Sequence, residues 1–148
     1  MAKVKKHTPG QVLLRLGFVV YVAAMLWLLF GQRWGGQLQR SINLTPFVTL
    51  RLYWKLLQHE SSYLVRHAVI NLVGNVVMFI PLGFFQPYLA PKLRTWYKTL
   101  LSTTALILLV EGIQYVTCLG SCDIDDLILN MIGALIGYVL WRITKKTS

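Results

Sequence analysis

The stretch ALILLVEGIQYVTCLGSCDIDDLILNMIGALIG, residues 105–137, places four of the chain's five acidic residues within or beside long apolar runs. Glu111 lies inside one run, while Asp123, Asp125 and Asp126 open the next. A carboxylate in a membrane-spanning helix is costly, and such residues usually mark a functional site. The stretch therefore predicts two membrane helices that carry a polar site.

The whole composition is typical of a membrane protein. Hydrophobic residues make up 55% of the 148 residues and charged residues only 14%, whereas about a quarter of an ordinary soluble chain is charged. Four apolar runs have the length that crosses a hydrocarbon core of about 30 Å; they cover residues 12–30, 67–85, 100–119 and 124–141. Without a visible repeat or linker, we expect one all-α domain over residues 1–148, a polytopic membrane protein with four transmembrane helices.

The first run follows three lysines and resembles a signal peptide. It is too long for a signal-peptide core, and it ends in FGQR, residues 30–33, instead of a cleavage site with small residues. We therefore expect a retained signal anchor.

Lysine and arginine predict the orientation. The N-terminal end, the loop between the second and third runs and the C-terminal tail carry ten cations and no acid. The positive-inside rule places such segments in the cytoplasm, so we expect a multi-pass protein of the bacterial cell membrane with both termini cytoplasmic. The loop of residues 31–66 is an objection, since it carries five cations and is assigned to the outside.

In this topology the polar residues of the last three runs reach one depth. Counting along each helix from the outer surface places most of them roughly 5 to 12 Å deep, in the outer leaflet. Spacings of three or four residues also put the polar residues of each helix on one face. We therefore predict a single polar site, formed by Asn71, Asn75, Glu111, Gln114, Asp123, Asp126 and Asn130.

Simpler roles remain open for several of these residues. Amides in membrane helices often only bond neighbouring helices. Asp123 is also placed to cap the last helix, with Asp125 and Asp126 favoured by its dipole. Glu111 differs, because a buried carboxylate must be paired, protonated or hydrated. The spacing of Gly133 and Gly137 is typical of a close helix contact.

The first loop predicts an interfacial helix. Thr45 and Pro46 resemble a helix N-cap followed by proline at the first helical position. The residues that follow are amphipathic, with Trp54 on the apolar face and Arg51 on the basic face. Such a helix either caps the polar site or only anchors the loop at the membrane surface.

Cys118 and Cys122 predict either a small-loop disulfide or two free thiols. A zinc site would need more ligands than the two cysteines, and few lie on that side of the membrane. The sequence identifies no specific cofactor, and Asp123, Asp126 and Glu111 are weak candidate oxygen ligands for Mg²⁺ or Ca²⁺. The cations divide into short clusters, which is typical of membrane topology and not of a nucleic-acid footprint.

The same residues carry a family resemblance. The motifs RxxNLxPF (40–47), NxxxNxxxFIPLG (71–83), ExxQ (111–114) and DIDDxxxNxxGAxxG (123–137) resemble, in this order, those of the VanZ-like family. The resemblance covers roughly residues 10 to 142. Relatives usually carry an arginine about three residues before the DIDD run, where this chain has Gly120. If that arginine pairs with an acid, the pairing here is absent or is supplied by Arg40, Arg51 or Arg66.

The resemblance implies a role at the cell envelope. The named member of the family is associated with resistance to teicoplanin, by a route separate from the altered precursors that defeat vancomycin. Most relatives are membrane proteins of unknown activity. It also implies that Arg40, Asn43 and Phe47 contribute to the site from the first loop. Teicoplanin carries an acyl chain and acts outside the membrane, in agreement with an outer-leaflet site.

The sequence is compatible with three functions. The favoured one is binding of a membrane lipid or lipid-linked cell-wall component, with lowered susceptibility to teicoplanin. The second is an intramembrane hydrolase or transferase, with Glu111 and Asp126 as candidate catalytic groups and a divalent cation at Asp123 and Asp126. The third is a small transporter with Glu111 as proton carrier. A homo-oligomer is left open, and no nucleic acid is expected.

Overall fold

Four long helices make up most of the part of the chain that the structure describes. The computed structural model describes residues 9–31, 42–59, 62–118 and 122–146. Within these ranges the membrane-length helices are α1 (Pro9–Phe30), α3 (Ser62–Leu89), α4 (Trp96–Val116) and α5 (Ile124–Lys146). A shorter helix, α2 (Val48–His59), precedes α3, and a 3-10 turn, η2 (Pro91–Leu93), connects α3 to α4. The predicted all-α, four-span membrane fold is confirmed.

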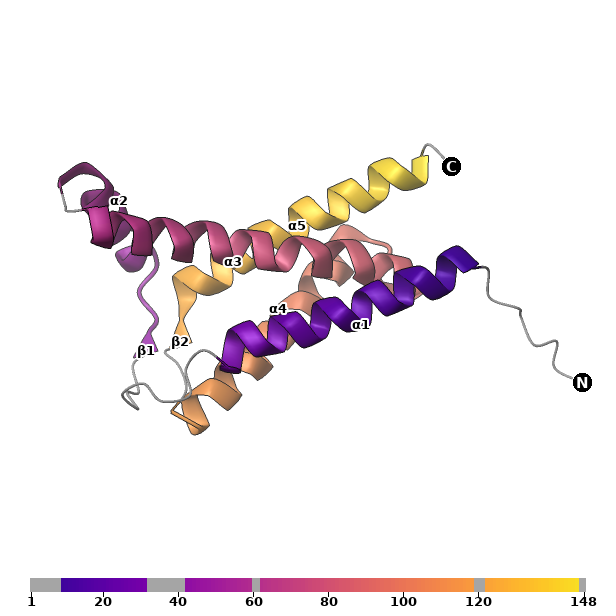
Figure 1. The fold of residues 1–148 in the computed structure, drawn as a ribbon, viewed down its shortest axis with the longest axis horizontal. Coiled ribbons are helices and arrows are strands. Elements are labelled where there is room, and N and C mark those ends of the chain that lie inside the picture. The colour runs from indigo at the N-terminus through magenta and orange to yellow at the C-terminus, as the bar shows by residue number, and fades with distance from the viewer. Residues whose placement is uncertain (1–8, 32–41, 60–61, 119–121, 147–148) are drawn as a thin grey trace, which may run out of the picture.

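The long helices alternate in direction. In Figure 1 the start of α1, the connection from α3 to α4 and the last turn of α5 lie at one end. The helix α2 and the two strands lie at the other end. We call the end with α2 and the strands the polar end, and the opposite end the basic end, after the residues described below.

The tightest contact joins α3 to α5, and glycines make it possible. A Cβ atom added to Gly133 would lie 2.1 Å from the backbone oxygen of Val76, and one added to Gly137 would lie 1.9 Å from that of Ile80. On the facing helix, a Cβ on Gly83 would lie 1.9 Å from the oxygen of Ala134. The backbones therefore touch at three points, which is the close helix contact that the sequence predicted.

The buried core is small, and most apolar side chains face outward. Phe79, Leu82 and Ile107 form a buried cluster between α3 and α4. By contrast, Leu101 and Val116 of α4 are 70% and 72% exposed. Such exposure is costly in water but natural where lipid surrounds the helices.

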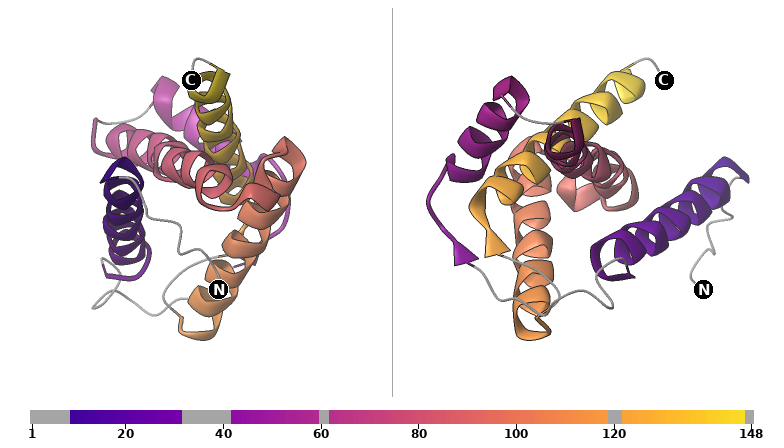
Figure 2. Two further views of the ribbon diagram at one scale, coloured as in Figure 1. Left: turned by 90° about the vertical axis from the view of Figure 1, so that its right-hand side faces the viewer. Right: turned by 60° about the vertical axis from the view of Figure 1, so that its left-hand side comes forward.

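The helix α1 lies at the edge of this bundle. None of its residues is buried. It is held to α3 by the ring of Phe18, whose centroid lies 5.5 Å from that of Phe85, and by the Tyr21 hydroxyl, which donates a hydrogen bond to the Met78 carbonyl. Figure 2 shows α1 as a separate arm beside the other helices. This helix is therefore the least embedded of the four.

Two short strands close the polar end. The strand β1 (Ile42–Asn43) pairs in parallel with β2 (Cys122–Asp123), so that Asn43 lies opposite Asp123. The sequence did not predict this pairing. It brings the first loop to the beginning of α5, across about 80 residues of chain.

Candidate functional site

Asp125 joins the first loop to α5 by capping a helix that is distant in sequence. Its side chain is fully buried, and its two oxygens accept hydrogen bonds from the backbone N–H groups of Phe47, Thr49 and Leu50 at 2.6, 2.8 and 3.1 Å. These groups belong to the start of α2, whose first turn has no internal partners for them. A carboxylate at a helix N-terminus is also favoured by the helix dipole.

This cap corrects the predicted start of α2. The helix begins at Val48 and not at Pro46, which the sequence predicted as the first helical position after an N-cap at Thr45. Phe47 has a φ of 66°, a left-handed conformation that interrupts the helix before it starts. The physical reason is that Asp125 supplies the acceptor that a local N-cap residue normally provides.

Asp123 binds β1 and α2 to the same corner. Its Oδ1 accepts hydrogen bonds from the Asn43 amide at 3.3 Å and from the Asp125 backbone N–H at 2.9 Å. Its Oδ2 accepts a bond from the Thr49 hydroxyl at 2.6 Å. The bond to Asp125 is the predicted N-cap of α5. Both oxygens of Asp123 therefore have hydrogen-bond donors from the protein.

A row of hydrogen bonds then leads from α2 into the bundle. The Asn71 amide donates to the Tyr53 hydroxyl at 2.5 Å. The Asn75 amide donates to the Asn71 side-chain oxygen at 3.0 Å and to Asp126 at 2.6 Å. The predicted spacing of Asn71 and Asn75 thus places them in contact along one face of α3, and the row ends on a carboxylate of α5.

The row ends at a small cavity between the helices. Its volume is about 40 Å³, and its lining includes five of the predicted site residues: Asn75, Glu111, Gln114, Asp126 and Asn130. The remaining lining residues are apolar: Leu29, Phe79, Ile107 and Val110. The structure thus brings together polar side chains from α3, α4 and α5 at one level of the bundle.

Two amides define the chemistry of this cavity. Gln114 is buried, and its amide donates to the Leu29 carbonyl of α1 at 2.9 Å. Asn130 is also buried, and none of the described residues places a donor within hydrogen-bond distance of its side-chain oxygen. A buried amide oxygen without a donor is costly, so a bound hydroxyl, N–H group or water would be stabilised there.

The carboxylates influence the pKa of two groups that lie outside the four long helices, Tyr53 of α2 and Cys122 of β2. Burial raises the pKa of the Tyr53 phenol above its usual 10.0, and the charge of Asp126 raises it further, while the hydrogen bond from Asn71 opposes the rise. Burial also raises the pKa of the Cys122 thiol above 9.0, helped by the charge of Glu111 and by a hydrogen bond to it. The pKa of the Cys122 thiol therefore depends in part on the charge of Glu111. Both Cys118 and Cys122 are free thiols, so the disulfide alternative is not the one observed.

The other predicted residues lie outside the cavity or outside the described residues. Arg40 and Gly120 lie outside the described residues. Phe47 contributes its backbone N–H to the Asp125 cap, while its side chain is 51% exposed. Arg51 and Arg66 are exposed.

Sequence reasoning missed the cap made by Asp125 and the contact between α1 and Gln114. The sequence predicted that Asp125 acts at the start of its own helix, α5. Its hydrogen-bond partners lie more than 70 residues away in the chain, and no local spacing indicates them. Leu29 offers a backbone carbonyl, which no side-chain pattern reveals.

The described part of the chain offers no obvious metal centre. Among residues 9–31, 42–59, 62–118 and 122–146, no three His, Cys, Asp or Glu side chains are grouped to hold an ion. The oxygens of Asp123 already accept hydrogen bonds from Asn43, Thr49 and Asp125. Glu111 and Asp126 line the cavity together with amide oxygens, which is the donor set that Mg²⁺ or Ca²⁺ prefers.

Comparison with known proteins agrees with this architecture. The family model VanZ/LLP1 matches residues 18–145. The chain is similar to Protein VanZ of Enterococcus faecium, with 28% identity over 149 residues that cover 93% of this chain and 78% of that protein. No solved structure matches. Since the family match covers most of the chain, including α3, α4 and most of α1 and α5, this multi-pass membrane protein belongs to the VanZ/LLP1 family.

Proposed function

We propose that the polar cavity binds a polar group of a membrane lipid or a lipid-linked cell-wall component, and that this binding lowers susceptibility to teicoplanin. The observation that carries the proposal is the cavity lining: two carboxylates and three amides, from three helices, surround one space inside an apolar bundle. Polar residues placed at such cost inside a membrane are usually functional.

The cavity favours a ligand that donates hydrogen bonds. Glu111 and Asp126 supply acceptor oxygens when ionised, and the Asn130 oxygen has no donor from the part of the chain that the structure describes. Hydroxyl, amide and amine groups, such as those of glycerol, sugars and ethanolamine, provide the complementary donors. A volume of about 40 Å³ accommodates one such group but not a whole headgroup. Entry of a lipid headgroup therefore requires the helices to move.

The helix α1 is best placed to make that movement. Leu29 lines the cavity, and its carbonyl is held by the Gln114 amide. No residue of α1 is buried, and its displacement would separate the rings of Phe18 and Tyr21 from the core cluster against which they pack. Displacement of α1 would open the cavity sideways, toward lipid.

Antibiotic susceptibility tests the proposal directly. A sensitive Gram-positive host is transformed with empty vector, wild type, Glu111→Gln, Asp126→Asn and Glu60→Gln, at matched membrane levels. Glu60→Gln is the matched control, since it makes the same acid-to-amide change in the first loop. We expect wild type and Glu60→Gln to protect against teicoplanin but not vancomycin, and both cavity variants to lose protection. Protection retained by both cavity variants, or absent from wild type, contradicts the proposal.

A second function is favoured by the pairing of acids. Glu111 and Asp126 line the same cavity, and two nearby carboxyl groups can serve as acid and base when one holds a proton. An intramembrane hydrolase or transferase would use them on a lipid-linked substrate. Protein reconstituted in lipid with Mg²⁺, Ca²⁺ or chelator would then form products that Glu111→Gln fails to form. A lack of product under all three conditions counts against this function.

A further inference from the structure

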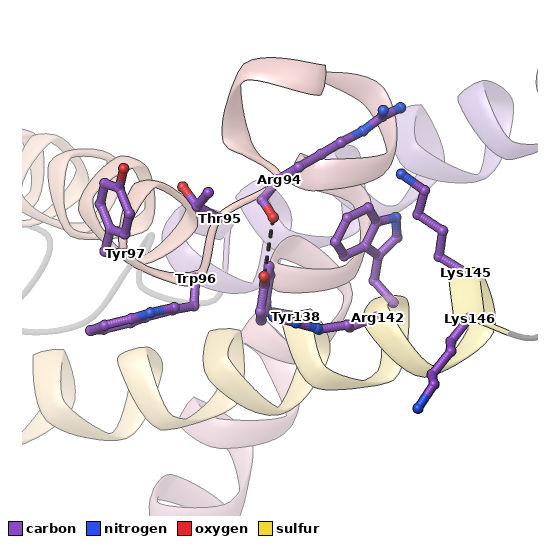
Figure 3. A pocket seen from close by; sticks show the side chains of 9 residues that line it. Arg94, Thr95, Trp96, Tyr97, Tyr138, Arg142, Lys145 and Lys146 are labelled. Atoms are coloured by element: carbon purple, nitrogen blue, oxygen red, sulfur yellow. Dashed lines mark hydrogen bonds between the residues drawn. The ribbon is translucent and has the colours of Figure 1, made fainter.

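A second pocket lies at the basic end, opposite the polar cavity. It lies between the beginning of α4 and the last turns of α5, and its volume is about 660 Å³. Nine residues line it, as Figure 3 shows: Arg94, Thr95, Trp96, Tyr97, Tyr138, Trp141, Arg142, Lys145 and Lys146. Cations and aromatic rings therefore make up most of its lining.

Among the residues that the structure describes, no acid lies beside the cations of this pocket. Arg94, Arg142, Lys145 and Lys146 are all exposed. The sequence contains no acidic residue between 61 and 110 or between 127 and 148. The four acids that the structure describes all belong to the opposite half of the bundle, at the polar end. A pocket of this kind attracts an anion.

The aromatic residues give the pocket a fixed frame. Tyr138 and Trp141 are buried, with their ring centroids 5.6 Å apart. The Tyr138 hydroxyl donates a hydrogen bond to the Arg94 carbonyl at 3.1 Å, which holds the connection before α4 against α5. The Lys145 ammonium lies 5.4 Å from the centre of the Trp141 ring. In Figure 3 the side chains of Arg94 and Lys145 extend toward the same side, while Lys146 extends away.

The surroundings distinguish a lipid from a soluble anion. Trp96 and Tyr97 are 56% and 52% exposed at the start of a membrane-length helix, where such rings usually lie at headgroup level. One helical turn further, Leu101 is 70% exposed and continues the outward apolar surface. A phosphate held by the cations thus lies directly above a surface suited to acyl chains.

We propose that this pocket binds the phosphate of an anionic phospholipid headgroup, with Arg94 and Lys145 as the principal contacts. Basic pockets between membrane helices are known to bind such headgroups. The site is separate from the polar cavity, and the proposal does not depend on the function proposed above.

Native mass spectrometry of the full-length protein in detergent tests the proposal. The protein is titrated with phosphatidylglycerol and with phosphatidylcholine of the same acyl chains, and glycerol 3-phosphate serves as the soluble competitor. Arg94→Gln and Lys145→Gln are compared with Lys92→Gln, which removes the same charge from the η2 turn, beside the pocket but outside its lining. The Tyr138 bond uses the Arg94 backbone, so Arg94→Gln leaves that contact in place.

We expect preferential binding of phosphatidylglycerol by wild type and Lys92→Gln. Each pocket variant should weaken it roughly fivefold, and the double variant about 25-fold. If Lys92→Gln weakened the binding of phosphatidylglycerol as much as the pocket variants do, the lipid would be attracted by the general positive charge of this end. That result would overturn the proposal. Equal binding of phosphatidylcholine would also overturn it. Competition by glycerol 3-phosphate at the lipid's own concentration would assign the pocket to a soluble phosphate instead.

Discussion

At the scale of single residues, the three aspartates that open α5 have three different surroundings. Asp123 accepts bonds from a side-chain amide, a hydroxyl and a backbone N–H, while Asp125 accepts only backbone N–H groups. Asp126 faces the cavity and accepts a bond from Asn75. Two of the three carboxylates therefore hold the polar end together, and only the third, with Glu111, is placed to meet a ligand.

The cap made by Asp125 gives a first prediction. Asp125→Asn removes the charge and turns one oxygen into an N–H donor that faces the N–H donors of α2. Hydrogen bonds to charged groups contribute about 1.5–3 kcal/mol, so we expect a loss of about 2 kcal/mol of stability. Thermal unfolding in detergent measures this loss of stability. Faster trypsin cleavage at Arg51 or Lys55 would show that the destabilised segment is α2. An unchanged unfolding temperature would show that the carboxylate is not the cap.

The thiol of Cys122 gives a second prediction, which concerns pH. Its raised pKa means that less thiolate is present near pH 8 than at an ordinary cysteine, so maleimide should react slowly. Glu111→Gln removes one cause of that rise, lowers the pKa and speeds the reaction. The rates are measured against pH in a Cys118→Ser background. Identical rate profiles for the two proteins would show that Glu111 carries no charge next to Cys122.

At the scale of elements, close contact between α3 and α5 and a distant cap on α2 fix the polar end. The glycine spacing in α5 predicted the contact between α3 and α5, because only glycine permits backbones to touch. The cap on α2 could not be predicted from the sequence. Thr45 and Pro46 resemble a local helix start, whereas the carboxylate that accepts the hydrogen bonds of α2 belongs to α5. The pairing of β1 with β2 was also missed, because two-residue strands leave no alternating pattern.

The glycine contact gives a third prediction. A methyl group at Gly137 would lie 1.9 Å from the Ile80 oxygen, so Gly137→Ala must push the helices apart. Overpacking of this kind typically costs about 1–3 kcal/mol. Gly112→Ala is the control, since nothing lies within 4 Å of its added carbon and alanine favours a helix. We expect a lower unfolding temperature for Gly137→Ala only. Equal temperatures for the two variants would contradict the close contact.

At the scale of the whole molecule, the chain has one acidic, hydrogen-bonded end and one basic, aromatic end. Four helices were predictable from hydropathy, because a membrane segment must satisfy its own backbone and therefore carries a long apolar run. Residue counting along these runs also predicted that the polar residues of three helices lie at one level. Five of them line the same cavity: Asn75, Glu111, Gln114, Asp126 and Asn130. The small size of the cavity and the contact of α1 with Gln114 depend on side-chain packing, which counting does not reveal.

The orientation of these two ends gives the last prediction. The basic end carries Arg94, Lys98, Arg142, Lys145 and Lys146 with no acid nearby, so the positive-inside rule places it in the cytoplasm. In a Cys118→Ser/Cys122→Ser background, Thr45→Cys tests the polar end and Thr95→Cys the basic end, and neither change alters a charge. We expect an impermeant maleimide to label intact cells only at position 45. Labelling only at position 95 would put the cavity in the inner leaflet, where a component of the outer cell wall could not reach it. The five cations of the first loop make this a real test, because they favour the opposite orientation.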